Sequence, residues 1–314
     1  MSERQSVARP NWTAYAALGV TTFGWGTAFV ATKVILAVWP PWGFMGMRFA
    51  AGALVFLGFL GAKKQLKIDQ KLILPLGVLA LFQPVLYFVF ETLALERTSA
   101  GSASIIIAAI PGVVALASGF FLKEHLSARG WFGAFLSILG IGIMTFLVPD
   151  SPTQSQSLVG NLFALGAVLA AVVYTLLTRH LSKRVSSLQL TGYQMFYAGL
   201  FFFPGLLVQG SEIFGAIPPF SVVVAFGFLV LVATFGAFLG FNYALSRIPA
   251  PQASMFLNGI PVVTVVVGWL VLGETLTLVQ GAGGGLALLG VMLAGTSGPN
   301  RTRRIQKDLP NPRS

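Results

Sequence analysis

The chain has 314 residues, of which 55% are hydrophobic and only 9% are charged, whereas a soluble domain carries roughly a quarter charged residues. This deficit excludes a soluble globular domain, whose surface needs charge, and indicates an integral membrane protein. The absence of cysteine excludes disulfides and thiolate chemistry, and the net charge of +11 does not indicate nucleic-acid binding, because the basic residues lie in short segments between apolar runs.

Ten apolar runs follow one another along the chain, each long enough for a spanning helix of about 20 residues. The first is too long for the apolar core of a cleavable signal peptide. Runs this long and this continuous predict helices, because the strands of a membrane barrel are shorter and alternate. The predicted spans are 13–38, 41–61, 72–94, 98–121, 128–148, 158–178, 189–209, 221–245, 249–272 and 277–297.

Lysine and arginine predict the orientation of these spans, because they accumulate in cytoplasmic segments. With the N-terminus in the cytoplasm, 17 of the 20 basic residues lie in inner segments, Arg97 lies outside, and Lys33 and Arg48 fall within spans. Ten spans return the chain to the cytoplasm. We therefore expect cytoplasmic tails at 1–12 and 298–314 on a multi-pass protein of the cell (inner) membrane.

The two halves of the chain match at an offset of 150 residues, and 103–144 aligns to 253–294 without gaps. Coinciding pairs include Arg97 and Arg247, Pro111 and Pro261, and Glu124 and Glu274. Five helices per half is an odd number, so the second half is expected to enter the membrane inverted, as in many secondary transporters. The predicted architecture is all-α, with ten transmembrane helices as two inverted five-helix repeats at 13–148 and 158–297 and an outer linker at 149–157.

Three ionisable residues, Lys33, Arg48 and Glu91, fall within the outer halves of spans, where such groups are costly and indicate function. The functional hypothesis is that Arg48 or Lys33 attracts a substrate carboxylate, while Glu91 pairs with a cation or takes up a proton. The alternative is a structural ion pair, with Lys33 reaching the outer headgroups. Glu91 is the candidate coupling residue because no other acidic residue lies clearly within a span. Glu124 and Glu274, at helix ends, are expected to be structural.

Pro111 and Pro261 lie in the middle of spans four and nine, where a proline frees a backbone carbonyl. Broken helices at matching positions of two halves indicate a binding site, although a packing kink is the alternative. Trp25 lies in mid-span, so its N–H needs a partner or a wet cavity. The predicted substrate-binding residues are Trp25, Arg48, Tyr87, Glu91, Pro111, Tyr174, Asn258 and Pro261, and Gln83, Asn242 and Tyr243 are further candidates for an uncharged polar lining.

Several short motifs together resemble the drug/metabolite transporter superfamily, in particular its EamA-type ten-helix members. They are Trp25-Gly26-x-x-Phe29 with Lys33, Pro40-Pro41 with Arg48-Phe49, Thr98-Ser99-Ala100-Gly101, Pro111, Leu122-Lys123-Glu124, Pro261 and Gly273-Glu274. The resemblance implies efflux of amino acids, related metabolites or drugs from the bacterial cytoplasm. It also implies that spans five and ten lie away from the substrate path and brace the other helices.

The expected function is export of an amino acid or related small metabolite by alternating access, with proton coupling as one option and an uptake permease as the main alternative. A membrane-embedded enzyme is disfavoured, because no predicted span holds two acids and both histidines lie at helix ends. A channel is disfavoured because no ring of like charge or filter sequence is visible. No metal or cofactor is expected. The expected partners are the solute and the lipid bilayer, not nucleic acid, and a homodimer is left open.

Overall fold

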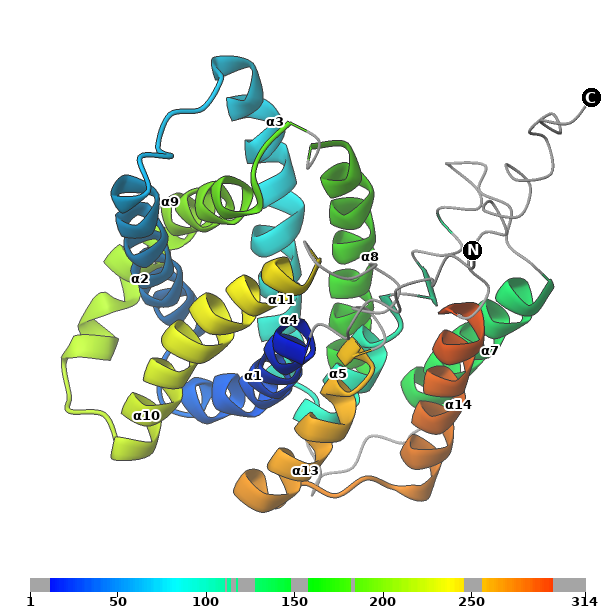
Figure 1. Ribbon diagram of the computed structural model, residues 1–314. Coiled ribbons are helices and arrows are strands. Elements are labelled where there is room, and N and C mark those ends of the chain that lie inside the picture. The colour runs from blue at the N-terminus through cyan, green and yellow to red at the C-terminus, as the bar shows by residue number, and fades with distance from the viewer. Residues whose placement is uncertain are drawn as a thin grey trace, which may run out of the picture.

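The computed structural model describes residues 12–110, 112–113, 117, 128–147, 158–181, 184–245 and 256–295. These residues form helices joined by short connections, and no strand occurs among them (Figure 1). The all-α fold expected from the apolar runs is confirmed for this part of the chain.

The helices follow the predicted spans closely. In chain order they are α1 (Trp12–Leu36), α2 (Pro41–Ala62), α3 (Gln70–Ala80), η1 (Leu81–Leu86), α4 (Tyr87–Leu95), α5 (Ala100–Ile107), α7 (Ala128–Phe146), α8 (Leu158–Leu181), α9 (Ser187–Phe214), α10 (Phe220–Phe228), η2 (Leu229–Gly236), α11 (Ala237–Leu245), α13 (Ile260–Leu272) and α14 (Leu278–Gly295). Within the described ranges, 3 stretches are long and apolar enough to cross a membrane, judged by length and composition alone: Pro41–Ala62, Gln70–Leu95 and Phe220–Phe241. The count of ten spans therefore stays a prediction.

One long helical stretch in each half has the same bounds at the 150-residue offset that the sequence shows. The continuous stretch α3–η1–α4 begins at Gln70 and ends at Leu95, and α10–η2–α11 begins at Phe220 and ends at Leu245. Each stretch is irregular in its middle: a kink at Gln83 interrupts the first within η1, and the second has the π-helical segment η2. A π-helical turn is wider than an α-helical one and leaves backbone groups without their usual partners, and such turns are frequent at functional sites.

Hydrogen bonds join helix ends that are distant in the chain at two places. At one place, Lys33 near the end of α1 donates to the carbonyl of Thr98 just before α5, at 2.7 Å. At the other place, the hydroxyls of Thr13 at the start of α1 and Tyr243 near the end of α11 lie 3.0 Å apart. An alternating up-and-down path of helices brings these particular ends together.

The interior is filled by apolar and aromatic side chains from neighbouring helices. Phe49 of α2 stacks on Phe202 of α9, with ring centroids 5.2 Å apart, and α2 and α9 run beside each other (Figure 1). At the opposite edge α7 and α14 lie side by side (Figure 1). Their backbones meet at Gly140, where an added Cβ would lie 2.5 Å from the carbonyl oxygen of Gly283. Small residues permit this close approach of helices in a membrane.

Candidate functional site

Arg48 of α2 and Glu91 of α4 lie in the interior and carry the charges of the candidate site. Their side chains are only 4% and 6% exposed. Tyr87, Phe88 and Glu91 occupy one face of α4, because residues three and four apart in a helix are neighbours. The guanidinium carbon of Arg48 lies 4.8 Å from the centroid of the Phe88 ring and 5.5 Å from that of Phe49. The two ring centroids are 5.0 Å apart, so the guanidinium lies against a pair of adjacent rings, in a geometry typical of a cation–π contact.

The charge of Arg48 is incompletely compensated. Glu91 and Tyr87 interact electrostatically with it, and the ion pairs in the described part of the chain involve neither Arg48 nor Glu91. The Nε of Arg48 is enclosed without a hydrogen-bond partner. An interior polar group without a partner is costly, and a guanidinium presents a planar fork of donors that matches a carboxylate. The arrangement is therefore suited to bind an anionic group beside Glu91.

The indole of Trp25 has a partner within the protein. Its Nε1 donates to the carbonyl of Ala233, in η2, at 3.1 Å. The carbonyl of Gln83, in η1, corresponds to that of Ala233 at the 150-residue offset, and it accepts a hydrogen bond from Nε2 of Gln194 at 3.0 Å. Side chains from other helices thus satisfy the carbonyls at both π-helical segments, as the apolar interior requires. Gln83 itself has extended backbone angles, φ −147° and ψ 119°.

Lys33 is not part of the Arg48–Glu91 group. Its Nζ forms an ion pair of 2.9 Å with Oε1 of Glu274. Glu274 also accepts hydrogen bonds from the backbone N–H groups of Ala100 and Gly101, at 3.2 and 3.4 Å. The carboxylate thereby satisfies free donors in the first turn of α5, where the helix dipole favours an anion. Of the two interpretations of Lys33, the ion pair is the one that this geometry supports.

Pro261 stands at the beginning of a helix rather than in the middle of a continuous one. A turn at Asn258 and Gly259 precedes α13, and Pro261 lies in its first turn, where the missing N–H costs little. In the first half, α5 gives way to a turn at the corresponding positions, 108–109. The predicted interruption of both helices is therefore present, although Pro111 lies outside the described residues. Asn258 is half-buried at this turn.

The remaining predicted residues are dispersed. Tyr174 of α8 packs against a separate apolar cluster that includes Leu72, Leu76 and Leu181, apart from the core that holds Tyr87 and Phe88. Tyr243 is exposed and bonds to Thr13. The side chain of Asn242 lies outside the described part of the structure.

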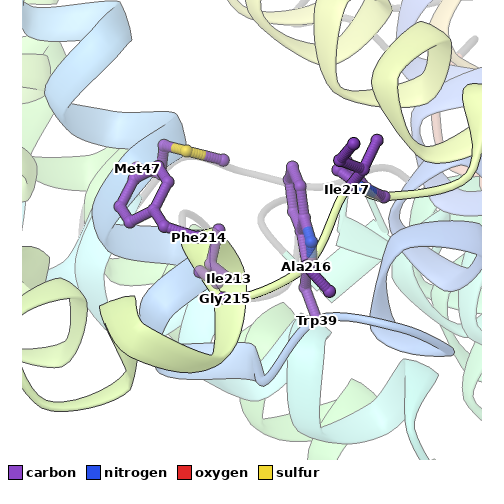
Figure 2. A pocket seen from close by; sticks show the side chains of 8 residues that line it. Trp39, Met47, Ile213, Phe214, Gly215, Ala216 and Ile217 are labelled. Atoms are coloured by element: carbon purple, nitrogen blue, oxygen red, sulfur yellow. The ribbon is translucent and has the colours of Figure 1, made fainter.

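A pocket of about 420 Å³ lies at the end of α1 and α9. Figure 2 shows the indole of Trp39 beside Ile217, with Met47 and Phe214 on the other side of the opening. Its lining is Trp39, Met47, Ile213, Phe214, Gly215, Ala216, Ile217 and Pro218. None of these eight side chains is ionisable, so the pocket offers no charged side chain to a solute.

Sequence reasoning missed the aromatic platform formed by Phe49 and Phe88 and the partner of Lys33. The adjacency of Arg48 to Phe49 and the spacing of Tyr87, Phe88 and Glu91 along one helix face are signals that point to the platform. Lys33 and Glu274 lie 241 positions apart in the chain, so no local sequence pattern points to their pairing.

Comparisons with known proteins agree with this architecture. A model of the EamA-like transporter family matches the chain twice, over residues 12–146 and 158–296. An uncharacterized transporter of Archaeoglobus fulgidus is 29% identical over 277 residues, which cover 88% of this chain and 96% of the relative. The uncharacterized transporter YcxC of Bacillus subtilis is 28% identical over 300 residues, covering 93% and 95%. A crystal structure of another protein has a TM-score of 0.60 at 17% identity, covering 91% of this chain and 98% of that one, which shows a shared fold.

The apolar helices, the buried charges between them and the transporter relatives define a multi-pass helical membrane protein of the transporter class. The chain belongs to the EamA-like transporter family. This confirms the resemblance to EamA-type members of the drug/metabolite transporter superfamily. It also points to a transport protein rather than an enzyme.

Proposed function

We propose that the protein is a secondary transporter that exports an amino acid or a related small metabolite across the cell membrane by alternating access. The observation that carries the proposal is the enclosed Arg48 guanidinium, whose Nε has no hydrogen-bond partner and which lies near Glu91 and Tyr87. A substrate carboxylate supplies the missing acceptor. The amino group of the same substrate pairs with Glu91 in this arrangement.

The mechanism assigns a different task to each charge. Arg48, which lies against the adjacent rings of Phe49 and Phe88, orients the carboxylate through its donor fork. Glu91 takes up a proton when the substrate amine is absent and loses it when the amine binds, which couples solute movement to a proton gradient. Two inverted copies of the five-helix unit, with both chain ends in the cytoplasm, expose the site of Arg48 and Glu91 to each side of the membrane in turn.

Replacing Glu91 with Gln tests the coupling. In proteoliposomes with a panel of radiolabelled amino acids, we expect the Glu91→Gln variant to lose uptake driven by a proton gradient. Exchange of labelled for unlabelled substrate should be weaker but still measurable, because the amide keeps an acceptor for the substrate amine but loses the charge. The matched control is Glu96→Gln, because Glu96 lies five residues away and pairs with Arg97 outside the interior. Proton-driven uptake at the parent rate in Glu91→Gln would reject the coupling role.

Replacing Arg48 with Met tests the binding role separately. Both driven uptake and exchange should fall to background, because the variant loses an interaction with the charged substrate group. A lost interaction of about 1.4 kcal/mol lowers the affinity for the substrate tenfold. Arg48→Lys is the conservative companion and should bind more weakly than the parent, since a single ammonium lacks the fork geometry. Unchanged exchange in Arg48→Met would contradict substrate contact at this residue.

The direction of transport is tested in cells. Metabolite profiling with and without the gene should show the substrate accumulating inside the deletion strain if the protein exports it. Depletion inside the deletion strain would favour the alternative, uptake of a similar solute.

A further inference from the structure

We propose that Lys33 and Glu274 form a latch that holds one face of the transporter closed. The inference rests on the alternating-access mechanism proposed above, because a latch is needed only if that face of the protein opens during transport. The ion pair joins α1 and the first turn of α5 to the segment that follows α13. It therefore connects the region 12–146 to the region 158–296, the two copies matched by the family model.

The latch is built from groups that converge from three segments. Lys33 Nζ contacts Oε1 of Glu274 at 2.9 Å and the carbonyl of Thr98 at 2.7 Å. The same carboxylate accepts from the N–H groups of Ala100 and Gly101. Removing Glu274 thus leaves the N–H groups of Ala100 and Gly101 without this acceptor and Lys33 with the Thr98 carbonyl. The contacts of Glu274 are lost together when α13 moves away from α5.

The backbone beside Glu274 is shaped for this contact. Gly273 ends α13 in the left-handed conformation, with φ 67°, and its N–H bonds to the carbonyl of Trp269. Such a glycine turns the chain sharply at a helix end at little steric cost. The turn places Glu274 across from the start of α5, outside the regular helix, where a small rotation of α13 is sufficient to withdraw it.

The partial exposure of the Lys33–Glu274 ion pair is typical of a contact that can break and reform. The Lys33 and Glu274 side chains are 19% and 17% exposed, so water reaches both charges when they separate. Nearer the start of α1, the bond from Thr22 Oγ1 to the carbonyl of Phe256 involves no charge. Among the described residues, the other ion pair joins the adjacent Glu96 and Arg97 and ties no two helices together. Lys183 and Glu124, at the 150-residue offset from Lys33 and Glu274, have the same charges, although they lie outside the described residues.

The absence of cysteine makes thiol labelling a direct test. Ser104 is fully buried in α5, one turn beyond the N–H groups that bind Glu274, so Ser104→Cys serves as the reporter in protein held in lipid nanodiscs. We expect a membrane-impermeant maleimide to label it slowly. Labelling should accelerate about fivefold or more when Glu274→Gln or Lys33→Met is added, since that factor corresponds to a modest shift of a two-state equilibrium.

Three controls make each outcome decisive. Glu96→Gln removes the ion pair that ties no helices together and should leave the labelling rate unchanged, and Lys33→Arg keeps the cation and should preserve slow labelling. Ala198→Cys, a buried reporter in α9, should not respond to the latch variants. Lys33→Met leaves the Glu274 contacts to α5 intact, so it stays informative if Glu274→Gln folds poorly.

An unchanged Ser104→Cys rate in folded Glu274→Gln and Lys33→Met would overturn the latch, and so would equal acceleration at Ala198→Cys, which signals general loosening. Labelling needs no substrate. Faster labelling of Ser104→Cys in the latch variants, together with no amino-acid transport by the parent protein, would support the latch and reject the substrate assignment. The two proposals therefore fail separately.

Discussion

At the scale of single residues, the interior polar groups divide into those that the protein satisfies and those that it leaves open. Trp25 donates to Ala233 and Thr264 donates to the carbonyl of Gly26 at 2.8 Å, so both tie helices together. Arg48 instead keeps Nε without a partner while its ring contacts hold it in place. The hydroxyls of Thr27 and Thr234 also have no partner, but of these three residues Arg48 alone carries a charge, which supports the binding role proposed for it.

The bond from Trp25 predicts a measurable loss of stability. Trp25→Phe leaves the Ala233 carbonyl without its donor, and we expect a destabilisation of about 1 kcal/mol, at the level of interhelical hydrogen bonds in membranes. Thermal unfolding in detergent measures it. The control is Trp39→Phe, because the Trp39 indole packs on Phe226 with centroids 5.7 Å apart and has no hydrogen-bond partner within the described part of the chain. Equal losses in the two variants would show that ring volume, not the bond, matters.

At the scale of helices, local sequence controls where a helix is interrupted and how closely two helices approach. The turn at Asn258 and Gly259 before Pro261 follows from the missing N–H of proline. The segment η2 is different, because no proline lies in it, whereas η1 contains Pro84. There the carbonyl of Ala233 bonds to Trp25 from another helix, so packing between helices, and not local propensity, stabilises the wider turn.

The contact between α7 and α14 gives a prediction with a control one half-turn away. In Gly140→Ala the new Cβ meets the backbone N of Ala287 and the carbonyl of Gly283, both at 2.5 Å, so the helices must separate, at a cost of about 1–3 kcal/mol. In Gly142→Ala the Cβ has nothing within 4 Å. We expect a lower melting temperature for Gly140→Ala alone. A similar decrease in Gly142→Ala would mean that helix geometry, not the close contact, is responsible.

At the scale of the whole molecule, two copies of one helical pattern enclose the buried charges. Helix bounds recur at the 150-residue offset, as in Gln70–Leu95 and Phe220–Leu245, and the family model matches both halves. The predicted inversion of the second copy, with five spans in each, would place both chain ends on one side of the membrane.

Cysteine accessibility in intact cells tests that arrangement. We expect Ser2→Cys and Ser314→Cys to react with an impermeant maleimide only after the membrane is permeabilised, because both tails are predicted to be cytoplasmic. Ile217→Cys is the positive control: Ile217 is 98% exposed between α9 and α10, on the predicted outer side, and should react in intact cells. Labelling of one chain end but not the other in intact cells would contradict the inverted repeat.

The sequence by itself determined the helical fold, the positions of the helices, the 150-residue repeat and the family, because these depend on local apolarity and on residues compared in register. It also singled out Arg48 and Glu91, since charges are scarce in apolar segments. Only the tertiary structure decided that Lys33 pairs with Glu274 and not with Glu91, that Phe88 supports Arg48, and that Ala233 satisfies Trp25. These contacts join residues far apart in the chain, and their partners depend on how helices pack, which local pattern does not specify.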